Sequence, residues 1–314
     1  MKAVKRDKKG YVGLGLRGML MGAADAVPGV SGGTIAFMTG IYAELIYSLK
    51  QCGPEAVKVL FKHGIPSAWR HINGNFLLSV FGGIIVSLIT LSHLVVFALE
   101  QYPVLLWSFF FGLILAAVWS VIRHIERWGV SVMASFALGT VVAFYVTIMT
   151  PTFIEATPIM VFLAGMIAIC AMILPGISGS FILLLLGMYA PMLNAVKSLQ
   201  FTTLAIFASG CVIGLLSFSR VLNWMFEKHK TLTLALLGGF MLGSLNKVWP
   251  WKVTIESIIN RHGKEIPLLQ SNVLPSTFET STGQHSYAML ALALMLLGVF
   301  MVYLLEKFGN KTGN

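Results

Sequence analysis

Two short segments of this sequence combine proline, glycine and serine in a pattern that can bind an anion. The first is Pro28-Gly29-Val30-Ser31-Gly32-Gly33-Thr34, and the second is Pro175-Gly176-Ile177-Ser178-Gly179-Ser180. Proline removes a helix donor and glycine tolerates unusual backbone angles, so each segment is expected to break a helix. A helix that begins just after each break would take Ser31 or Ser178 as its N-cap.

The residues that follow each break leave backbone N–H groups uncovered by side chains. Such groups, together with the positive end of the helix dipole, favour a phosphate or carboxylate ligand. We therefore predict that both breaks contribute to one anion site, whose members are Ser31, Gly32, Gly33, Thr34, Ser178, Gly179 and Ser180. The alternative is that the two serines only cap their own helices and the glycines only permit close packing.

Two charged residues precede the first break. Arg17 is costly inside a membrane unless it meets an anion or a carboxylate, so it either clamps the ligand phosphate or pairs with Asp25. Asp25 itself has three possible roles: it can coordinate a cation, relay a proton or cap N–H groups at the break. The equivalent position in the second copy is Met172, so the two copies differ chemically here.

Three further residues are candidates for coupling or for the entrances to the site. Glu44 suits proton coupling or an ordinary place at the membrane interface, while His93 and Arg220 align between the copies and suit the reception of a headgroup. The alternative is that His93 and Arg220 lie at helix ends near the interface and have no functional role. The sequence shows no metal-ligand spacing, and its three cysteines are far apart, so we expect no metal and no cofactor. Coupling to H⁺ or Na⁺ stays open.

The composition indicates a polytopic membrane protein. Of 314 residues, 57% are hydrophobic and only 11% are charged, which is too few charges for a soluble surface. The net charge of +10 does not require nucleic acid, because cytoplasmic membrane loops collect lysine and arginine. The basic N-terminus resembles a signal peptide, but Arg17 and several glycines interrupt its apolar stretch, so we expect it to be retained.

The apolar runs predict an all-α fold of two inverted-topology repeats. Each repeat is expected to hold a re-entrant broken-helix hairpin and three transmembrane helices, with residues 50–74 and 248–285 as polar loops. Residues 1–150 form the first repeat, with its hairpin at 12–49 and spans at 76–99, 104–122 and 130–149. Residues 151–314 form the second, with its hairpin at 159–195 and spans at 202–222, 231–247 and 286–305.

Direct alignment shows the repeat. At a shift of 147, residues 28–43 match residues 175–190 with eight of sixteen identical, and at a shift of 127 residues 83–118 align with 210–245. If each hairpin returns to its own side, each half crosses three times and the second half is inverted. With both termini in the cytoplasm, sixteen lysines and arginines lie inside and five outside. Hairpins that cross the membrane as two spans remain an alternative, because the charge count does not separate the two topologies.

The stretch Met21-Gly22-Ala23-Ala24-Asp25-Ala26-Val27-Pro28-Gly29-Val30-Ser31-Gly32-Gly33-Thr34-Ile35-Ala36 closely resembles a bacterial family, the polyprenyl-phosphate transporters or undecaprenyl-phosphate translocases. Gly40-Ile41-Tyr42 and Leu174-Pro175-Gly176-Ile177-Ser178-Gly179-Ser180 are also similar to that family. The resemblance covers essentially the whole chain. It implies a protein of the bacterial cytoplasmic membrane that returns the lipid carrier phosphate from the outer to the inner leaflet for reuse in peptidoglycan. It does not identify binding residues beyond the two motifs.

Two other functions compete with this one. A small-anion channel or carrier could use the same paired helix ends without an opening towards lipid. A lipid phosphatase is a weaker alternative, because no histidine or lysine base lies near Ser31 in the sequence and the motif occurs twice. We therefore expect a transporter that is not an enzyme, with a polyprenyl phosphate as its partner, working by alternating access. The sequence leaves the transport direction, the chain length of the lipid and the oligomeric state undetermined.

Overall fold

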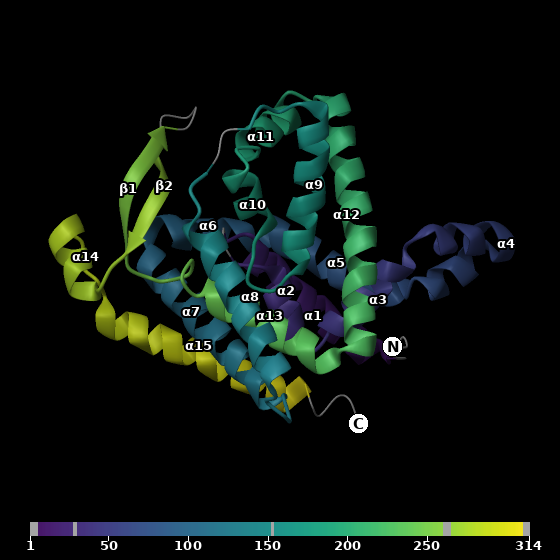
Figure 1. Ribbon diagram of the computed structural model, residues 1–314, viewed down its shortest axis with the longest axis horizontal. Helices are drawn as coiled ribbons and strands as arrows, with labels where there is room; N and C mark the ends of the chain where they lie inside the picture. Colours follow the sequence, from purple (N-terminus) through teal and green to yellow (C-terminus); the bar gives the residue numbers. More distant parts are fainter. Residues whose placement is uncertain (1–5, 28–29, 152–153, 260–264, 310–314) are drawn as a thin grey trace.

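The computed structural model describes residues 6–27, 30–151, 154–259 and 265–309 (Figure 1). The described residues of the first half form α1 (Lys8–Asp25), α2 (Gly32–Met38), α3 (Tyr42–Gln51), α4 (Pro54–His71), α5 (Gly74–Thr90), α6 (Ser92–Gln101), α7 (Pro103–Arg123) and α8 (Val130–Ile148). Those of the second half form α9 (Pro158–Ile173), α10 (Gly179–Leu185), α11 (Tyr189–Lys197), α12 (Phe201–Lys228), α13 (Lys230–Ser244), β1 (Lys252–Ile259), β2 (Glu265–Asn272), α14 (Pro275–Thr282) and α15 (Ala288–Gly309).

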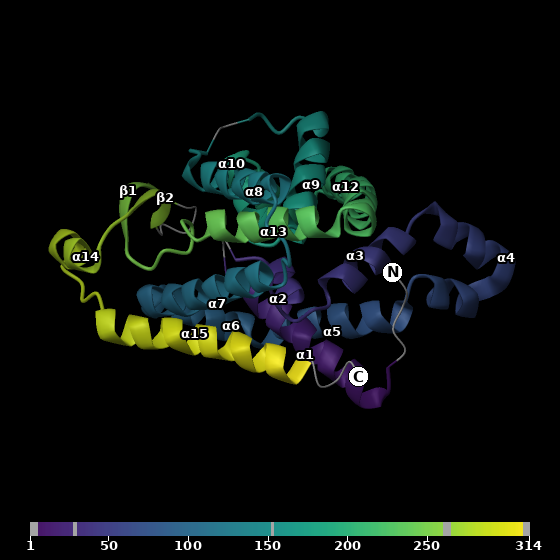
Figure 2. The same cartoon turned by 60° about the horizontal axis from the view of Figure 1, so that its bottom comes forward.

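The long helices lie in two layers, which Figure 2 shows one above the other. The lower layer holds α1, α5, α6, α7 and α15, and the upper layer holds α8, α9, α10, α12 and α13. The most extensive packing joins α1 with α5, α9 with α12, α7 with α15, and α8 with α13. Each half therefore places its last long helix, α8 or α15, in the layer formed mainly by the other half.

Glycine makes the same close crossing in both halves. A Cβ added to Gly83 of α5 would lie 2.1 Å from the carbonyl oxygen of Gly15 in α1. A Cβ added to Gly210 of α12 would lie 2.1 Å from the carbonyl oxygen of Phe162 in α9. Gly83 and Gly210 are related by the shift of 127, and Gly15 and Phe162 by the shift of 147. The crossing of α1 on α5 thus corresponds residue by residue to the crossing of α9 on α12.

A second pair of crossings corresponds in the same way, and here the partners come from opposite halves. A Cβ on Gly112 of α7 would lie 2.0 Å from the carbonyl oxygen of Met295 in α15, and one on Gly239 of α13 would lie 2.1 Å from that of Phe136 in α8. Gly112 and Gly239 are again related by the shift of 127. Two pairs of close helix crossings therefore involve glycines that correspond at the shift of 127.

The broken hairpins are more angular than the sequence predicts. The arm expected after each break is two helices: α2 and α3 in the first half, and α10 and α11 in the second. Gly40 (φ 73°) and Gly187 (φ 68°) separate them in the left-handed conformation that favours glycine, and α10 and α11 meet at an angle of 109°. Pro28-Gly29 of the first break lies outside the described residues.

Four of the predicted spans agree with single long helices: 104–122 with α7, 130–149 with α8, 202–222 with the longer α12, and 286–305 with α15. The span 231–247 ends earlier, at Ser244, and the span 76–99 is two consecutive helices, α5 and α6, that meet at Leu91. Among the described residues, α7, α8 and α12 are each long and apolar enough to cross a membrane, and the bent pairs α4–α5 and α10–α11 pass the same test together. The chain is thus a mainly helical, multi-pass membrane protein.

Two segments expected to be polar loops are ordered. Residues 50–74 contain α4, which is kinked at Gly64 (φ 76°) just before Pro66 and has no buried residue. Residues 248–285, expected to be a loop, contain the antiparallel pair β1–β2 and the short helix α14, while the described chain is otherwise helical as predicted. The β1–β2 pair with α14 and the helix α4 lie at opposite ends of the molecule (Figure 1, Figure 2).

The first hairpin lies in the main hydrophobic core. Val27, Val30, Ala36 and Ile46 are all fully buried, and they pack in one cluster with side chains of α5, α7 and α13. Burial of these apolar side chains fixes the position of the short helix α2 and of the residues that flank the break. The core thereby holds the first break in the interior, where it meets the second.

Candidate functional site

The two broken segments contact each other directly. The hydroxyl of Thr34, in the first turn of α2, accepts a 2.9 Å hydrogen bond from the backbone N–H of Gly176 in the second break. The hydroxyl of Ser31 donates to the backbone carbonyl of Met172 at 3.0 Å, near the end of α9. Both side chains are fully buried. The structure thus brings together the two motifs that the sequence predicts to share one site.

The protein itself fills the N-terminal end of α2. The N–H of Gly32 donates to a carboxylate oxygen of Asp25 at 2.7 Å, and the N–H of Gly33 donates to the hydroxyl of Ser31 at 3.1 Å. Ser31 is therefore the predicted N-cap. Of the three roles open to Asp25, the geometry shows the capping role. A carboxylate already occupies the position at which a ligand anion was expected to bind the first break.

The N-terminal end of α10 differs. Ser178 occupies the N-cap position with extended backbone angles (φ −97°, ψ 133°), but no side chain caps the helix within the described part of the chain. The hydroxyl of Ser178 lies 2.8 Å from that of Ser180 and pairs with it instead. The predicted capping bond of Ser178 is therefore absent from the described residues. The second helix end has no counterpart of Asp25, as the Met172 position predicts.

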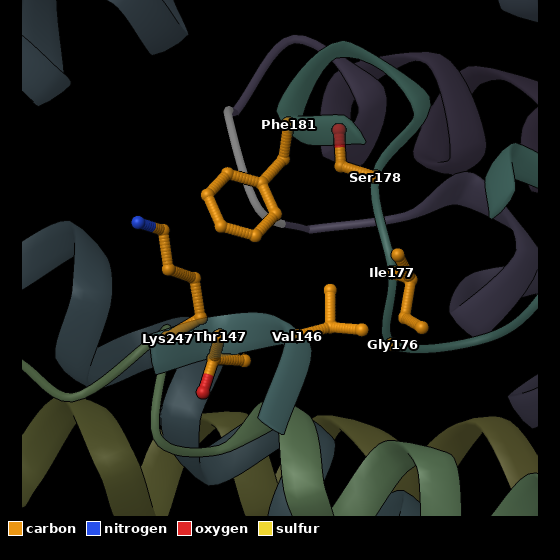
Figure 3. A pocket seen from close by; sticks show the side chains of 7 residues that line it. All are labelled: Val146, Thr147, Gly176, Ile177, Ser178, Phe181 and Lys247. Carbon is orange, nitrogen blue, oxygen red and sulfur yellow. The ribbon is translucent and has the colours of Figure 1, made fainter. Parts of the chain in front are cut away.

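A small cavity lies beside this second helix end. Its lining combines the second break and the start of α10 with the end of α8 and the third residue after α13: Val146, Thr147, Gly176, Ile177, Ser178, Phe181 and Lys247 (Figure 3). The ammonium nitrogen of Lys247 lies 4.3 Å from the centre of the Phe181 ring, a cation–π contact. The cavity is therefore bordered by a serine of the motif and by a cation.

A larger cavity of about 340 Å³ shares Thr147, Phe181 and Lys247 with the first. Its wall extends over the end of α8, the helix α10 and the β1–β2 pair, through Ile148, Met149, Pro151, Leu184, Leu185, Asn246, Lys252, Gln270, Ser271 and Asn272. Among the described residues of this lining, lysine is the only charged type.

Lys252 is the second cation of the larger cavity. Its ammonium donates to the backbone carbonyl of Lys247 and lies 4.1 Å from the centre of the Trp107 ring. Burial, and then the neighbouring charge of Lys247, lower the pKa of Lys252 to about 7. The sequence did not single out either lysine, because both border a segment expected to be a polar loop. The flanking Trp249 and Trp251 are of a residue type typical of a membrane interface.

The other predicted residues lie outside this lining. Arg17 is half-buried in α1 and forms no hydrogen bond or ion pair with Asp25, whose carboxylate bonds to Gly32. His93 is exposed on α6. Arg220 is exposed on α12, where it donates to the carbonyl of Leu216 on its own helix at 3.3 Å. Binding roles for these residues stay predictions.

Glu44 has structural partners at the start of the chain. Its carboxylate forms a two-pronged ion pair with Arg6, at 2.6 and 2.9 Å, and accepts a 3.0 Å hydrogen bond from the amide of Asn73. These contacts tie α3 to the residues that precede α1 and α5. Proton coupling through Glu44 stays a prediction.

Within the described residues no group of three or more metal-ligating side chains is present.

Comparisons with known proteins give a consistent result. A family model described as undecaprenyl phosphate translocase-like matches residues 21–266. A polyprenyl-phosphate transporter of Vibrio cholerae serotype O1 is 51% identical over 301 residues, which is 96% of this chain and 98% of that protein. A polyprenyl-phosphate transporter of Staphylococcus aureus is 33% identical over 254 residues, 75% of this chain and 85% of that protein. No solved structure matches the chain.

Proposed function

The chain belongs to the undecaprenyl phosphate translocase-like family, and on that premise we propose that it carries a polyprenyl phosphate between the leaflets of the cytoplasmic membrane. The observation that carries the proposal is the hydrogen-bonded junction of two broken helices, one from each half, beside a cavity lined by lysine. Bare backbone at membrane depth is tolerated where it is buried in protein or lines a cavity, and transporters place their substrates at such broken helices.

The two halves are proposed to be inverted repeats, each with a re-entrant hairpin and three membrane crossings. The equivalent glycine crossings and the exchange of α8 and α15 between layers support this organisation. With both termini in the cytoplasm, β1 and β2 lie on the outer side. The larger cavity, which β2 borders, then receives a headgroup from the outer leaflet, in agreement with transport towards the cytoplasm for reuse of the lipid carrier.

Alternating access is proposed to exchange the roles of the two hairpins. In this structure α3 packs against α12 of the other half, with the rings of Tyr42 and Phe226 5.9 Å apart. The equivalent residue of α11, Tyr189, is instead 44% exposed. The α3 side is therefore the closed side and the α11 side the open one. In the opposite state α11 closes, α3 separates from α12, and Asp25 leaves Gly32 so that the first helix end can take the phosphate.

A transport assay tests this function. Purified protein is reconstituted in vesicles with a labelled polyprenyl phosphate, and the double variant Ser178→Ala/Ser180→Ala is compared with Ser209→Ala. The hydroxyl of Ser209 bonds only to its own helix, so this control is expected to transport like the wild type. The double variant should lose at least about tenfold, since hydrogen bonds to a charged group are worth about 1.5–3 kcal/mol. Arg17→Ala tests the separate prediction that Arg17 clamps the phosphate.

Other results of the same assay would support the alternatives. Flux of a small anion without movement of the lipid would indicate a channel or small-anion carrier, and release of inorganic phosphate would indicate a phosphatase. Coupling to H⁺ or Na⁺ stays a prediction, which transport under each ion gradient in turn would test. Equal transport by the wild type and protein-free vesicles would overturn the proposed function.

A further inference from the structure

Resting on the function proposed above, we propose that Lys247 and Lys252 together form a binding site for the terminal phosphate of a lipid monophosphate. The lipid chain would leave the cavity between the end of α8 and the helix α10. The site is asymmetric, because both lysines belong to the second half and to the face that carries the β1–β2 pair.

The charges of the cavity require an anion. Two ammonium groups border one space, and the described residues of its lining include no carboxylate. Neither lysine forms an ion pair within the described residues; each ammonium instead lies over an aromatic ring, Phe181 or Trp107. Cation–π contacts stabilise a charge without neutralising it. Since burial disfavours uncompensated charge, two such groups at one cavity favour a dianion such as a phosphate monoester.

The polar neighbours position the lysines and are themselves engaged. The amide of Asn246 donates to the hydroxyl of Thr147 at 2.8 Å, which fixes the end of α13 to the end of α8. The amide of Asn272, at the end of β2, donates to the carbonyl and side-chain oxygens of Asn246 at 2.8 and 2.9 Å. These bonds hold β1 and β2 against the helices and so keep Lys252 at the cavity. The ammonium groups are therefore the charged donors that this part of the lining offers to a ligand.

The size and the apolar wall of the cavity point to a lipid headgroup. A volume of about 340 Å³ lies near the lower end of the range of about 300–1,000 Å³ that is typical of small-molecule pockets. That space admits a phosphate and the first prenyl unit, but a long polyprenyl chain must lie outside it. Ile148 and Met149 line the cavity and are 51% and 43% exposed. Leu184 continues the apolar wall on α10, so a chain can pass between these elements into the bilayer.

Binding of farnesyl phosphate, a short-chain prenyl monophosphate, tests the site directly. The full chain is placed in lipid nanodiscs, and affinity is measured for the wild type, Lys247→Gln, Lys252→Gln, both lysine-to-arginine variants, and Lys230→Gln. Lys230 is an exposed lysine at the opposite end of α13, so it serves as the matched control. We expect each glutamine variant at the cavity to bind at least tenfold more weakly, and the arginine variants and the control to bind within threefold of the wild type.

The outcomes are distinguishable. Glutamine variants that bind farnesyl phosphate as tightly as the wild type would overturn the site. Arginine variants that bind within threefold of the wild type show that the chain still folds when either lysine is replaced. Inorganic phosphate that competes as well as farnesyl phosphate would overturn the assignment to a lipid. Farnesol, which lacks the phosphate, should bind weakly and equally to all variants; a preference for the wild type would overturn the phosphate assignment. If the wild type binds farnesyl phosphate through both lysines but moves no lipid in vesicles, the proposed function fails and the site stands.

Discussion

The replacement of Thr34 by valine tests the contact between the two breaks. Valine has nearly the same shape as threonine but cannot accept the 2.9 Å hydrogen bond from the N–H of Gly176. Thr34 is fully buried, so water cannot replace the lost acceptor. An unsatisfied buried donor costs about 1–3 kcal/mol, and we expect Thr34→Val to lower the free energy of unfolding by that amount.

Thr39→Val is the matched control on the same hairpin. The hydroxyl of Thr39 donates at 2.8 Å to the carbonyl of Ile35 in its own helix, and that carbonyl also accepts from the N–H of Thr39. Its loss leaves no group unsatisfied, so the free energy of unfolding should change by less than about 0.5 kcal/mol. Reversible unfolding of the purified protein in mixed detergent micelles measures both variants under one set of conditions.

Transport gives a second readout for the same pair of variants. If the Thr34 bond sets the geometry of the second helix end, Thr34→Val should also reduce lipid transport, while Thr39→Val should not. The reasoning is refuted if the two variants have equal stability and equal transport. Loss of stability without loss of transport would show that the bond supports the fold but not the site.

Three further predictions follow from single contacts. Gly83→Ala should cost about 1–3 kcal/mol of stability, because its Cβ would lie 2.1 Å from a carbonyl oxygen of α1. The control Gly82→Ala meets nothing within 4 Å and should be neutral or stabilising. Thermal unfolding in detergent compares the two variants. Asp25→Ala should destabilise the protein by about 1–3 kcal/mol, because the N–H of Gly32 loses its acceptor. Asp25→Asn keeps an acceptor oxygen and should retain most of that stability in the same measurement. Equal losses of stability in the two variants would contradict the capping role of Asp25. Binding of farnesyl phosphate should weaken above about pH 7, because Lys252, whose pKa is about 7, loses its positive charge as the pH rises. In a pH series of binding measurements, Lys252→Arg should remove this loss of affinity. A Lys252→Arg variant with the same pH profile as the wild type would contradict the role of Lys252.

The sequence predicted the features that depend on apolar length and on the repeated motif. Long uninterrupted runs located α7, α8 and α15 closely, because a helix that crosses a bilayer needs about 20 apolar residues. The two Pro-Gly-x-Ser-Gly segments predicted two breaks that meet, and the bond between Thr34 and Gly176 joins them. The motif was sufficient to predict the two breaks because glycine and proline act on the backbone locally, wherever they occur.

The remaining features depend on contacts that no local pattern encodes. Gly40 and Gly187 end the short helices after each break, but a glycine in an apolar run is equally compatible with close helix packing. The pairing of Ser178 with Ser180, in place of a capping bond, is not predicted by their spacing. Asn272 joins β2 to Asn246, a contact between residues 26 positions apart, beside the two cavity lysines. Tertiary contacts of this kind explain why the sequence did not single out Lys247 and Lys252.

Photocrosslinking of the substrate tests the central claim most directly. A polyprenyl phosphate that carries a photoreactive group next to its phosphate is irradiated with the reconstituted protein, and the labelled peptides are identified by mass spectrometry. We expect labelling of residues 176–181 and 246–252, which border the cavity at the second break, and its suppression by excess farnesyl phosphate. Labelling confined to α4 or to the outer faces of α12 and α15, with the cavity residues unlabelled, would contradict the account.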